Sequence, residues 1–255
     1  FGSSGYLGKK CLIAYNDQSK IVMKYNLDSL RCGVIDGAPI RLTKHNISNA
    51  LISRLIPIDD STFVAGGTYK THYQHLIFDS YGRVLDYGID VYNAADSSFN
   101  TETRFLSNQG YMAKHPYKNK FAYSVNFSSN LDFFEVVNNK IELKRSLRLG
   151  NPACESLVEN GGQLFSARPT KESIHGFIEV CATPKYLYAL YSDGKIYEVQ
   201  RKSKTVFVFD WDGNPIKELL LDTDVFHIAV NEKEQNLFAV VKNEDGGFNV
   251  ICYVL

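Results

Sequence analysis

The stretch Lys204 to Asp222, KTVFVFDWDGNPIKELLLD, constrains the fold most, because it has the pattern of a strand, a tight turn and a second strand. β-Branched and aromatic residues precede the turn at Asp212-Gly213-Asn214-Pro215, and an apolar pattern resumes after it. An Asp-Gly turn between two such runs is the strongest short-range signal for a β-hairpin. The sequence therefore predicts an antiparallel hairpin in this stretch.

Weaker versions of this unit recur along the chain, each with an apolar strand, a short polar turn and a second apolar strand. A third strand follows most of them after a turn rich in Asp, Asn and Gly, residue types that suit tight turns. These turns are Asp79–Gly82, Asn138-Asn139 and Asp212–Asn214. The five copies begin at Lys10, Thr62, Asn119, Tyr186 and Asn236.

A further apolar stretch precedes most copies, which raises the expected number of strands in each unit to four. These preceding stretches are Leu51 to Ile58, Gly110 to Lys114, Phe177 to Ala182 and Val225 to Val230. Four strands repeated with a period of roughly 50 residues are typical of a β-propeller blade. Stacking such sheets around an axis buries both apolar faces of each one. We therefore expect an all-β propeller of four-stranded antiparallel blades, five of them visible in this chain.

No long helix is predicted, and residues 146–175 are the least regular part of the chain. Loops of that length are uncommon and are often functional, although a variable insertion in one blade is the simpler interpretation.

The composition excludes several classes of function. The chain of 255 residues carries 28 basic and 28 acidic side chains, so it has no electrostatic footprint for nucleic acid. No apolar run approaches the roughly 20 residues that span a bilayer. The five cysteines are scattered without C-x-x-C spacing, which argues against a disulfide framework or a structural zinc site. We expect Cys11, Cys181 and Cys252, which lie in strand-like runs, to be small buried apolar groups.

Local catalytic and metal motifs are missing, and no cofactor is expected. The sequence has no G-x-S-x-G, H-E-x-x-H or phosphate-binding glycine loop. His72 and His75 are three residues apart, which places them on opposite faces of a strand. Asp210-x-Asp212-Gly213 resembles the start of a calcium loop, but a strand follows at once where further ligands would be required. We therefore interpret it as a turn.

The remaining candidates are polar residues on the first strand of each blade, which lines the axis of a propeller. The candidate binding residues are Arg54, His115, Glu179 and His227. Basic and acidic groups held apart in a concave polar site can bind a small polar ligand or shift a pKa. A water-filled channel with hydrogen-bonded polar walls is the other interpretation, and the sequence favours it.

Several motifs resemble the TolB-like six-bladed propellers, exported bacterial proteins that are mostly uncharacterised. They are Phe207–Pro215 followed by Leu221-Asp222 and Ile228–Val230, the stretch Tyr186–Ser192, and His115-Pro116-x-x-Asn119–Ala122. The resemblance covers roughly the last two thirds of the chain. It implies a six-bladed propeller and an exported location, and no catalytic residues.

The start of the chain is similar to the glycine-rich segment with which family members leave their first blade. By this resemblance, residues 1–255 form a single propeller domain in which residues 1–8 are the exit of a missing first blade. The resemblance also implies a location in the periplasm or at the cell surface, with a lipid anchor, if one exists, in a segment outside this sequence.

Two functions from different classes are compatible with these residues. The first is a non-catalytic, monomeric binding or scaffold propeller of the bacterial cell envelope that recognises a protein or glycan partner on one rim. Its candidate anchors are the loop aromatics Tyr69, Tyr73, Tyr92 and Tyr117. The alternative is a hydrolase or lyase at the mouth of the central channel, which requires Arg54, His115, Glu179 or His227 to converge. The missing motifs favour the binding protein over the enzyme.

Overall fold

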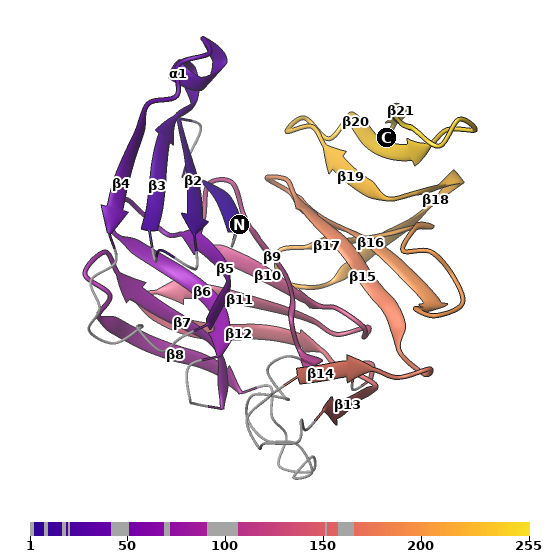
Figure 1. Ribbon diagram of the computed structural model, residues 1–255, viewed down its shortest axis with the longest axis horizontal. Coiled ribbons are helices and arrows are strands. Elements are labelled where there is room, and N and C mark those ends of the chain that lie inside the picture. The colour runs from indigo at the N-terminus through magenta and orange to yellow at the C-terminus, as the bar shows by residue number, and fades with distance from the viewer. Residues whose placement is uncertain are drawn as a thin grey trace. The chain divides into compact units, whose positions relative to one another are not determined.

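The computed structural model describes residues 3–7, 10–16, 19, 21–41, 51–68, 72–90, 107–150, 152–157 and 166–255. Within these residues the regular structure is mostly β-sheet, and α1 (Leu27–Arg31), the helix described from end to end, has five residues. Besides a two-stranded sheet, five larger antiparallel sheets follow one another along the chain (Figure 1). Four of them have four strands in sequence order, and the last sheet has three. The predicted all-β class is confirmed.

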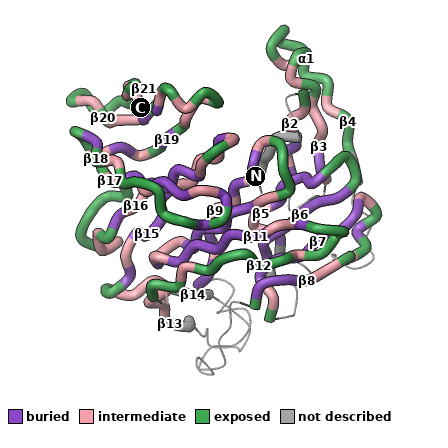
Figure 2. Tube along the Cα trace, turned by 180° about the vertical axis from the view of Figure 1, so that it is seen from behind, coloured by how far each residue is buried: buried purple, intermediate pink, exposed green. Residues whose placement is uncertain are grey.

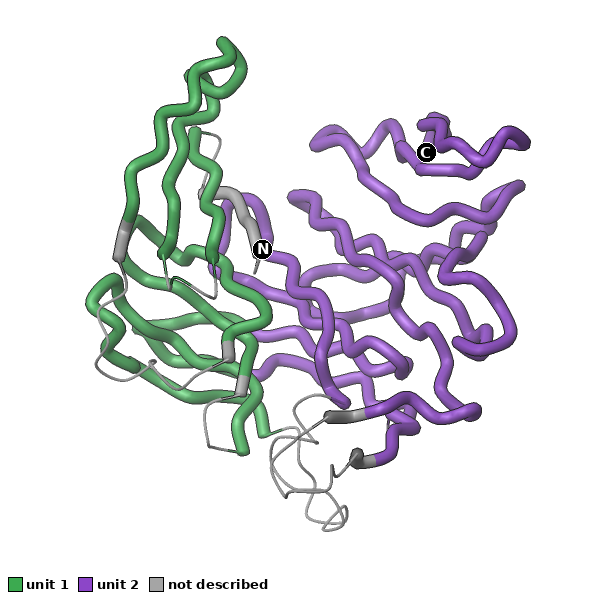
Figure 3. The backbone as a smooth tube through the Cα atoms, in the orientation of Figure 1, with its two compact units in different colours: residues 1–105, 135–142 green, residues 106–134, 143–255 purple. Residues whose placement is uncertain are grey.

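The chain divides into two compact units (Figure 3), residues 1–105 with 135–142 and residues 106–134 with 143–255. The first two sheets lie in unit 1. Their strands are β1 (Ser3–Leu7), β2 (Cys11–Asn16), β3 (Ile21–Asn26), β4 (Gly37–Arg41), β5 (Leu51–Pro57), β6 (Thr62–Thr68), β7 (Tyr73–Asp79) and β8 (Val84–Asp90).

The third sheet has the order β12-β11-β10-β9, and a two-stranded sheet separates it in sequence from the fourth. The fourth and fifth sheets have the orders β15-β16-β17-β18 and β19-β20-β21. The strands are β9 (Gly110–Lys114), β10 (Lys120–Val125), β11 (Leu131–Val137), β12 (Lys140–Leu147), β13 (Cys154–Leu157), β14 (Ser166–Pro169), β15 (Ile174–Ala182), β16 (Tyr186–Lys195), β17 (Ser203–Asp210), β18 (Pro215–Val225), β19 (His227–Val230), β20 (Asn236–Lys242) and β21 (Phe248–Val254).

Side chains that alternate along the strands build the cores between successive sheets. In unit 1, Ile13 and Tyr15 of β2 pack with Leu55, Phe63 and Leu76 of the second sheet. Because successive side chains of a strand point to opposite faces, one central strand can supply two cores.

Strand β16 is the example of this in unit 2. Leu187 and Ala189 belong to the core shared with the third sheet, whereas Tyr188 and Leu190 belong to the core shared with the fifth. Strand β15, which pairs with β16, is the first strand of the fourth sheet. It also contacts β9 and β19, the first strands of the third and fifth sheets.

The predicted hairpin turns are confirmed, and two of them share one hydrogen-bond pattern. Asp79 Oδ1 accepts from the backbone N–H groups of Tyr81 and Arg83, at 2.9 and 3.0 Å. Asp210 Oδ1 accepts in the same way from Asp212 and Asn214, at 2.9 and 2.8 Å.

Each of these turns needs a glycine, because Gly82 and Gly213 have φ of 76° and 81°. Burial alone would raise the pKa of Asp79 and of Asp210, but the hydrogen bonds to their charged forms outweigh it and lower both pKa values.

Three features differ from the sequence-based expectations. Residues 146–175 contain the paired strands β13 and β14, where no strand was predicted. The helix α1 joins β3 to β4, and Asn26 caps it by accepting from the backbone N–H groups of Asp28 and Ser29. Cys252 was predicted to be buried but is exposed, because its neighbours Ile251 and Tyr253 are the residues of β21 that pack against the core.

Residues 1–8 were interpreted as the exit of an earlier blade. Their described part, Ser3–Leu7, forms strand β1 and pairs with β2 from Leu7↔Cys11 to Ser3↔Tyr15. It is thus the first strand of the first sheet.

Candidate functional site

The four candidate residues from the sequence lie on or directly after the first strands of their sheets. Arg54 is on β5 in unit 1, where its Nη1 donates to the carbonyl of Ser53 at 2.9 Å. His115 follows β9, Glu179 is on β15 and His227 begins β19, all three in unit 2.

Glu179 and His227 are the two candidates that the structure brings together. His227 Nδ1 lies 3.4 Å from the Glu179 carboxylate, and its side chain is 66% exposed. The Glu179 carboxylate also accepts a 2.8 Å hydrogen bond from the backbone N–H of Ile228. Two residues further along β15, the Cys181 sulfur accepts from Val230 N–H at 3.3 Å. The carboxylate therefore takes part in fastening β19 to β15, as well as facing an exposed imidazole.

His115 is instead a buried structural residue, only 3% exposed. Its Nδ1 accepts from the backbone N–H groups of Tyr117 and Lys118, at 3.0 and 3.1 Å, and its ring lies 5.1 Å from that of Trp211. Because Nδ1 accepts both of these bonds, the neutral ring carries its proton on Nε2.

Burial lowers the pKa of His115, the positive charge of Lys118 lowers it further, and the hydrogen bond to Pro184 opposes both. A folded-state pKa below the unfolded value means that the unfolded chain binds the proton more tightly. The contribution of His115 to stability is therefore complete above about pH 6.5 and is lost as the pH falls through the lowered pKa.

We expect the free energy of unfolding to decline below about pH 6.5, by at most about 1.4 kcal/mol per pH unit for this one group. In His115→Asn the side-chain oxygen can still accept from Tyr117 and Lys118, but it does not titrate. Urea denaturation of both proteins between pH 5 and pH 8 measures the difference in slope. Equal slopes would show that His115 does not titrate with folding.

Of the possible metal ligands noted in the sequence, the two histidines differ in exposure and the two aspartates are bonded to other protein groups. His72 is exposed, with its ring 4.1 Å from that of Tyr73, whereas His75 is completely buried in β7. The carboxylate of Asp210 is occupied by its own turn, and Asp212 pairs with Lys120 at 2.7 Å. Among the described residues, no group of three or more His, Cys, Asp or Glu side chains could hold a metal ion.

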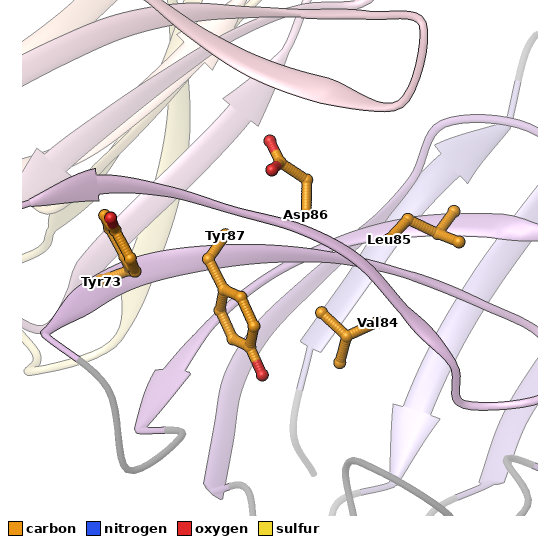
Figure 4. A pocket seen from close by; sticks show the side chains of 5 residues that line it. All are labelled: Tyr73, Val84, Leu85, Asp86 and Tyr87. Carbon is orange, nitrogen blue, oxygen red and sulfur yellow. The ribbon is translucent and has the colours of Figure 1, made fainter.

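The sequence did not find a cavity at the outer edge of the second sheet, although it named one of its residues, Tyr73. This tyrosine pocket has a volume of about 620 Å³ and is lined by Tyr73 of β7 and by Val84, Leu85, Asp86 and Tyr87 of β8 (Figure 4). The rings of Tyr73 and Tyr87 stack with centroids 6.2 Å apart and planes 23° from parallel. Strand β8 is the outermost strand of the sheet, so the pocket opens where a partner can reach it.

The tyrosine pocket is anchored on its polar side. Asp86 points to the opposite side of β8 from Tyr87 (Figure 4), and its Oδ2 accepts from the backbone N–H of Ile141 at 2.8 Å. Tyr87 also packs against the core of unit 1. Two of the lining side chains are therefore held in place by contacts outside the pocket.

A second cavity in unit 2, of about 790 Å³, lies between the β13–β14 hairpin and the β16–β17 connection. Three of its charged side chains form ion pairs, Arg168 with Glu155 at 3.8 Å and Glu172 with Lys195 at 2.9 Å, and the other two, Lys171 and Glu198, have opposite charges. The Tyr197 hydroxyl donates to the carbonyl of Pro169 at 2.9 Å. These pairs leave the cavity with little unbalanced charge to select a ligand.

Of the aromatic anchors named from the sequence, Tyr73 lines the tyrosine pocket and Tyr117 is 53% exposed. Tyr69 and Tyr92 lie outside the described residues.

A protein-family model matches most of the chain. It is described as TolB-like 6-blade propeller-like and matches residues 13–233. The chain belongs to this family. The predicted propeller class and the predicted family are both confirmed, and this TolB-like propeller forms five of the blade-type sheets within its described residues.

No curated protein matches the chain. Among solved structures, the β-propeller domain of Cps50 (Swd1) from Myceliophteria thermophila matches with 9% identity and a TM-score of 0.44, over 100% of this chain and 83% of that one. AztD from Citrobacter koseri matches with 15% identity and a TM-score of 0.45, over 97% of this chain and 53% of that one. Apo AztD from the same organism matches with 13% identity and a TM-score of 0.47, over 98% of this chain and 56% of that one. This TolB-like propeller thus spans little more than half the length of the AztD chains.

In the part of the chain that the structure describes, no helix has the length and apolar character needed to cross a membrane.

Proposed function

We propose that this TolB-like propeller is a non-catalytic binding module of the bacterial cell envelope, and that its tyrosine pocket receives a glycan. The observation that supports this most is the stacked pair Tyr73 and Tyr87 in a cavity of about 620 Å³ at the edge of the second sheet. The family membership supports the choice of a propeller as the scaffold.

The chemistry of the tyrosine pocket suits a sugar ring. A tyrosine offers an apolar face on which the C–H groups of a sugar can pack, and a hydroxyl at its end that can exchange hydrogen bonds. Asp86, which points to the other side of β8, serves as an anchor through its bond to Ile141 and leaves the tyrosine rings to provide the contact surface. A site with a few rigid aromatic faces and a small number of polar groups is typical of pockets for small molecules.

The size of the pocket favours a glycan over a protein partner. The tyrosine pocket is an open hollow of about 620 Å³, which gives room for a short oligosaccharide lying against the edge of the sheet. A protein partner would instead bury about 800 Å² on each side, mostly against a contiguous surface. Of the five lining residues, Leu85 is the only one among the exposed large hydrophobic side chains, at 40% exposure.

The alternative function, a hydrolase or lyase at the mouth of the channel, depends on the pair Glu179–His227. A general acid–base pair needs free ring and carboxylate atoms to reach a substrate. The Glu179 carboxylate is bound to Ile228 N–H and His115 is held by its turn, so this site is left with one exposed imidazole. These occupied groups favour the binding module.

The test is a glycan array of bacterial cell-wall and capsular oligosaccharides, followed by calorimetry on the strongest ligand. We expect binding to one class of oligosaccharide, and Tyr73→Ala to weaken it about tenfold through loss of a stacking face, which corresponds to about 1.4 kcal/mol. Tyr73→Phe keeps the ring and should keep most of the affinity.

Tyr81→Ala is the matched control, because Tyr81 is a 64% exposed tyrosine in the β7–β8 turn that does not line the pocket. The affinity of Tyr81→Ala for the glycan should stay within about twofold of that of the unsubstituted protein. Equal losses in Tyr73→Ala and Tyr81→Ala, or an array without any binding, would overturn the glycan proposal. Binding of a protein with no dependence on Tyr73 would also overturn it.

The same proposal includes an exported location, in the periplasm or at the cell surface, and a monomer that forms one propeller domain over residues 1–255. The family of exported propellers that the motifs resemble supports the location.

A further inference from the structure

A third aromatic ring continues the stacked pair of the tyrosine pocket. His72 lies directly before β7 and is exposed, and its ring centroid is 4.1 Å from that of Tyr73, with the two planes 40° apart. Tyr73 in turn stacks with Tyr87 at 6.2 Å. Tyr73 is therefore the middle member of a chain of three rings. We call this chain the ring row; its members are His72, Tyr73 and Tyr87.

The ring row follows a boundary between buried and accessible residues in the second sheet. Strand β7 is buried from its second residue onward, whereas the first four residues of β8 are exposed or half-buried (Figure 2). His72 is exposed, and Tyr73 and Tyr87 are half-buried. A ligand can therefore contact all three members of the ring row at the edge of the sheet.

The two tyrosine rings are displaced sideways from one another. Nearly parallel rings in contact have planes about 3.5 to 4 Å apart. The centroids of Tyr73 and Tyr87 are 6.2 Å apart with planes 23° from parallel, which implies a sideways step of roughly 5 Å between the rings. Rings offset in this way leave part of each face uncovered by the other ring. The step is comparable to the length of one sugar unit, so neighbouring rings can face neighbouring units of a chain.

The backbone beside the ring row is strained. Tyr73 is paired with Asp90, and Tyr87 lies three residues before Asp90, so regular alternation would place the two tyrosines on opposite faces of the sheet. Ile89 lies between Tyr87 and Asp90 with φ of 60°, in the left-handed region where a β-branched residue is an outlier. It interrupts the alternation just after Tyr87. Strain of this kind persists only where the surrounding structure enforces it, and it is concentrated at ligand sites.

We propose that His72 is a further binding residue of the tyrosine pocket, and that the ring row binds three consecutive units of a linear β-1,4-linked oligosaccharide. The proposal rests on the proposed glycan function, to which it adds the chain length and the linkage of the ligand. The equatorial bonds of β-1,4 linkages give an extended chain, so successive units can pack on successive rings. The axial bond of an α-1,4 linkage curves the chain away from one end of the row.

The chemistry of the ring row suits repeated units better than a single charged sugar. Imidazole and phenol rings offer apolar faces and polar edges, and a sugar ring likewise has C–H groups on its faces and hydroxyls around its edge. Val84 and Leu85 add apolar lining. Because Asp86 is bonded to Ile141 on the other side of β8, recognition depends on ring faces, and these repeat along the row.

Calorimetry with ligands of increasing length tests the proposal. The probes are two β-1,4-linked series, of glucose and of N-acetylglucosamine, from one to four sugars, and the α-1,4-linked glucose series as the control. We expect the affinity for one β-1,4-linked series to rise about tenfold with each added sugar up to three and to level off at four. The α-1,4-linked trisaccharide should bind at least tenfold more weakly. Equal affinity for one and three sugars, or for the two linkages, would overturn the proposal.

Substitutions of His72 identify the role of its ring. His72→Gln keeps a polar side chain but has no ring face, so it should weaken binding of the trisaccharide about tenfold and that of the disaccharide by less than about twofold. His72→Phe keeps a ring and should bind the trisaccharide within about threefold of the unsubstituted protein. If His72→Gln binds the trisaccharide as tightly as the unsubstituted protein does, His72 is not a binding residue.

These outcomes are separate from the test of the glycan function itself. If the glycan array finds a ligand that depends on Tyr73 but neither β-1,4-linked series binds, the ring row proposal is overturned and the glycan pocket stands. If no glycan binds at all, both proposals are overturned.

Discussion

Gly176→Ala is expected to lower the free energy of unfolding by about 3 kcal/mol or more, because two separate penalties meet at this residue. Gly176 has φ of +62°, in the left-handed region that residues with a Cβ rarely adopt. A Cβ built there would lie 2.1 Å from the carbonyl oxygen of Ser128 and 2.8 Å from its nitrogen. Both are backbone atoms, so no side chain can swing away to make room. Urea denaturation measures the loss.

The close approach has a structural reason. Gly176 forms an isolated antiparallel bridge with Asn126, which brings the start of β15 against the connection between β10 and β11. An added methyl group would push these two segments apart and weaken the core that the third and fourth sheets share.

Gly33→Ala is the matched control, since Gly33 also has positive φ, +77°, but has nothing within 4 Å of the Cβ position. Gly33→Ala should lower the free energy of unfolding by only about 1 kcal/mol, the cost of placing a residue with a Cβ in the left-handed region. If the two variants lose the same stability, the clash with Ser128 does not exist in solution.

The second large effect is expected for Arg148→Met, which should cost about 3 to 5 kcal/mol at pH 7 because it leaves a buried carboxylate without its charged partner. Asp132 on β11 is completely buried, and Arg148 Nη2 lies 2.6 Å from its Oδ2. Ser146 donates to the other oxygen at 2.5 Å. Methionine keeps much of the side-chain length but has no donor.

The pH dependence of this variant identifies the mechanism. Burial raises the pKa of Asp132, and the charge of Arg148 and the hydroxyl of Ser146 oppose that rise. Without Arg148 the pKa should rise further. A raised folded-state pKa means that the folded protein holds the proton more tightly than the unfolded chain. The loss of stability in Arg148→Met should therefore be largest above the folded-state pKa of Asp132, and it should shrink as the pH falls toward about 4.

Thermal unfolding between pH 4 and pH 8 measures this change. The double variant Asp132→Asn/Arg148→Met should show no such pH dependence, because its amide does not titrate. Arg83→Met is a control for the arginine alone: Arg83 pairs with Asp79 at 2.7 Å, but its side chain is 68% exposed, so its loss should cost less than about 1 kcal/mol. A deficit in Arg148→Met that is constant across the pH range would contradict the buried-carboxylate explanation.

The elements that the sequence predicted correctly have their determinants within a few residues. The turns at Asp79–Gly82 and Asp210–Asn214 form because an aspartate accepts from the backbone N–H groups ahead of it and a glycine tolerates positive φ. The unpredicted pair β13 and β14 has four residues per strand, CESL and SARP, with little intrinsic strand preference. Such strands form only because each has the other as a partner, which no local pattern encodes.

The candidate site was harder to predict for a related reason. The first-strand positions of Arg54, Glu179 and His227 followed from the repeats, because strand order is visible in the sequence. The role of His115 depends on its contacts with Trp211 and Pro184, which lie about 70 to 100 residues away in sequence. The tyrosine pocket likewise depends on which face of β8 each side chain takes and on the pairing of β7 with β8.

The consecutive order of strands within each sheet bears on how the protein is made. Because neighbours in a sheet are also neighbours in sequence, a nascent chain can finish one sheet while the next is still in the ribosome. Each completed sheet then exposes an apolar face until the next sheet is synthesised and packs on it. The speed of translation therefore sets how long this surface is available to chaperones and to other nascent chains.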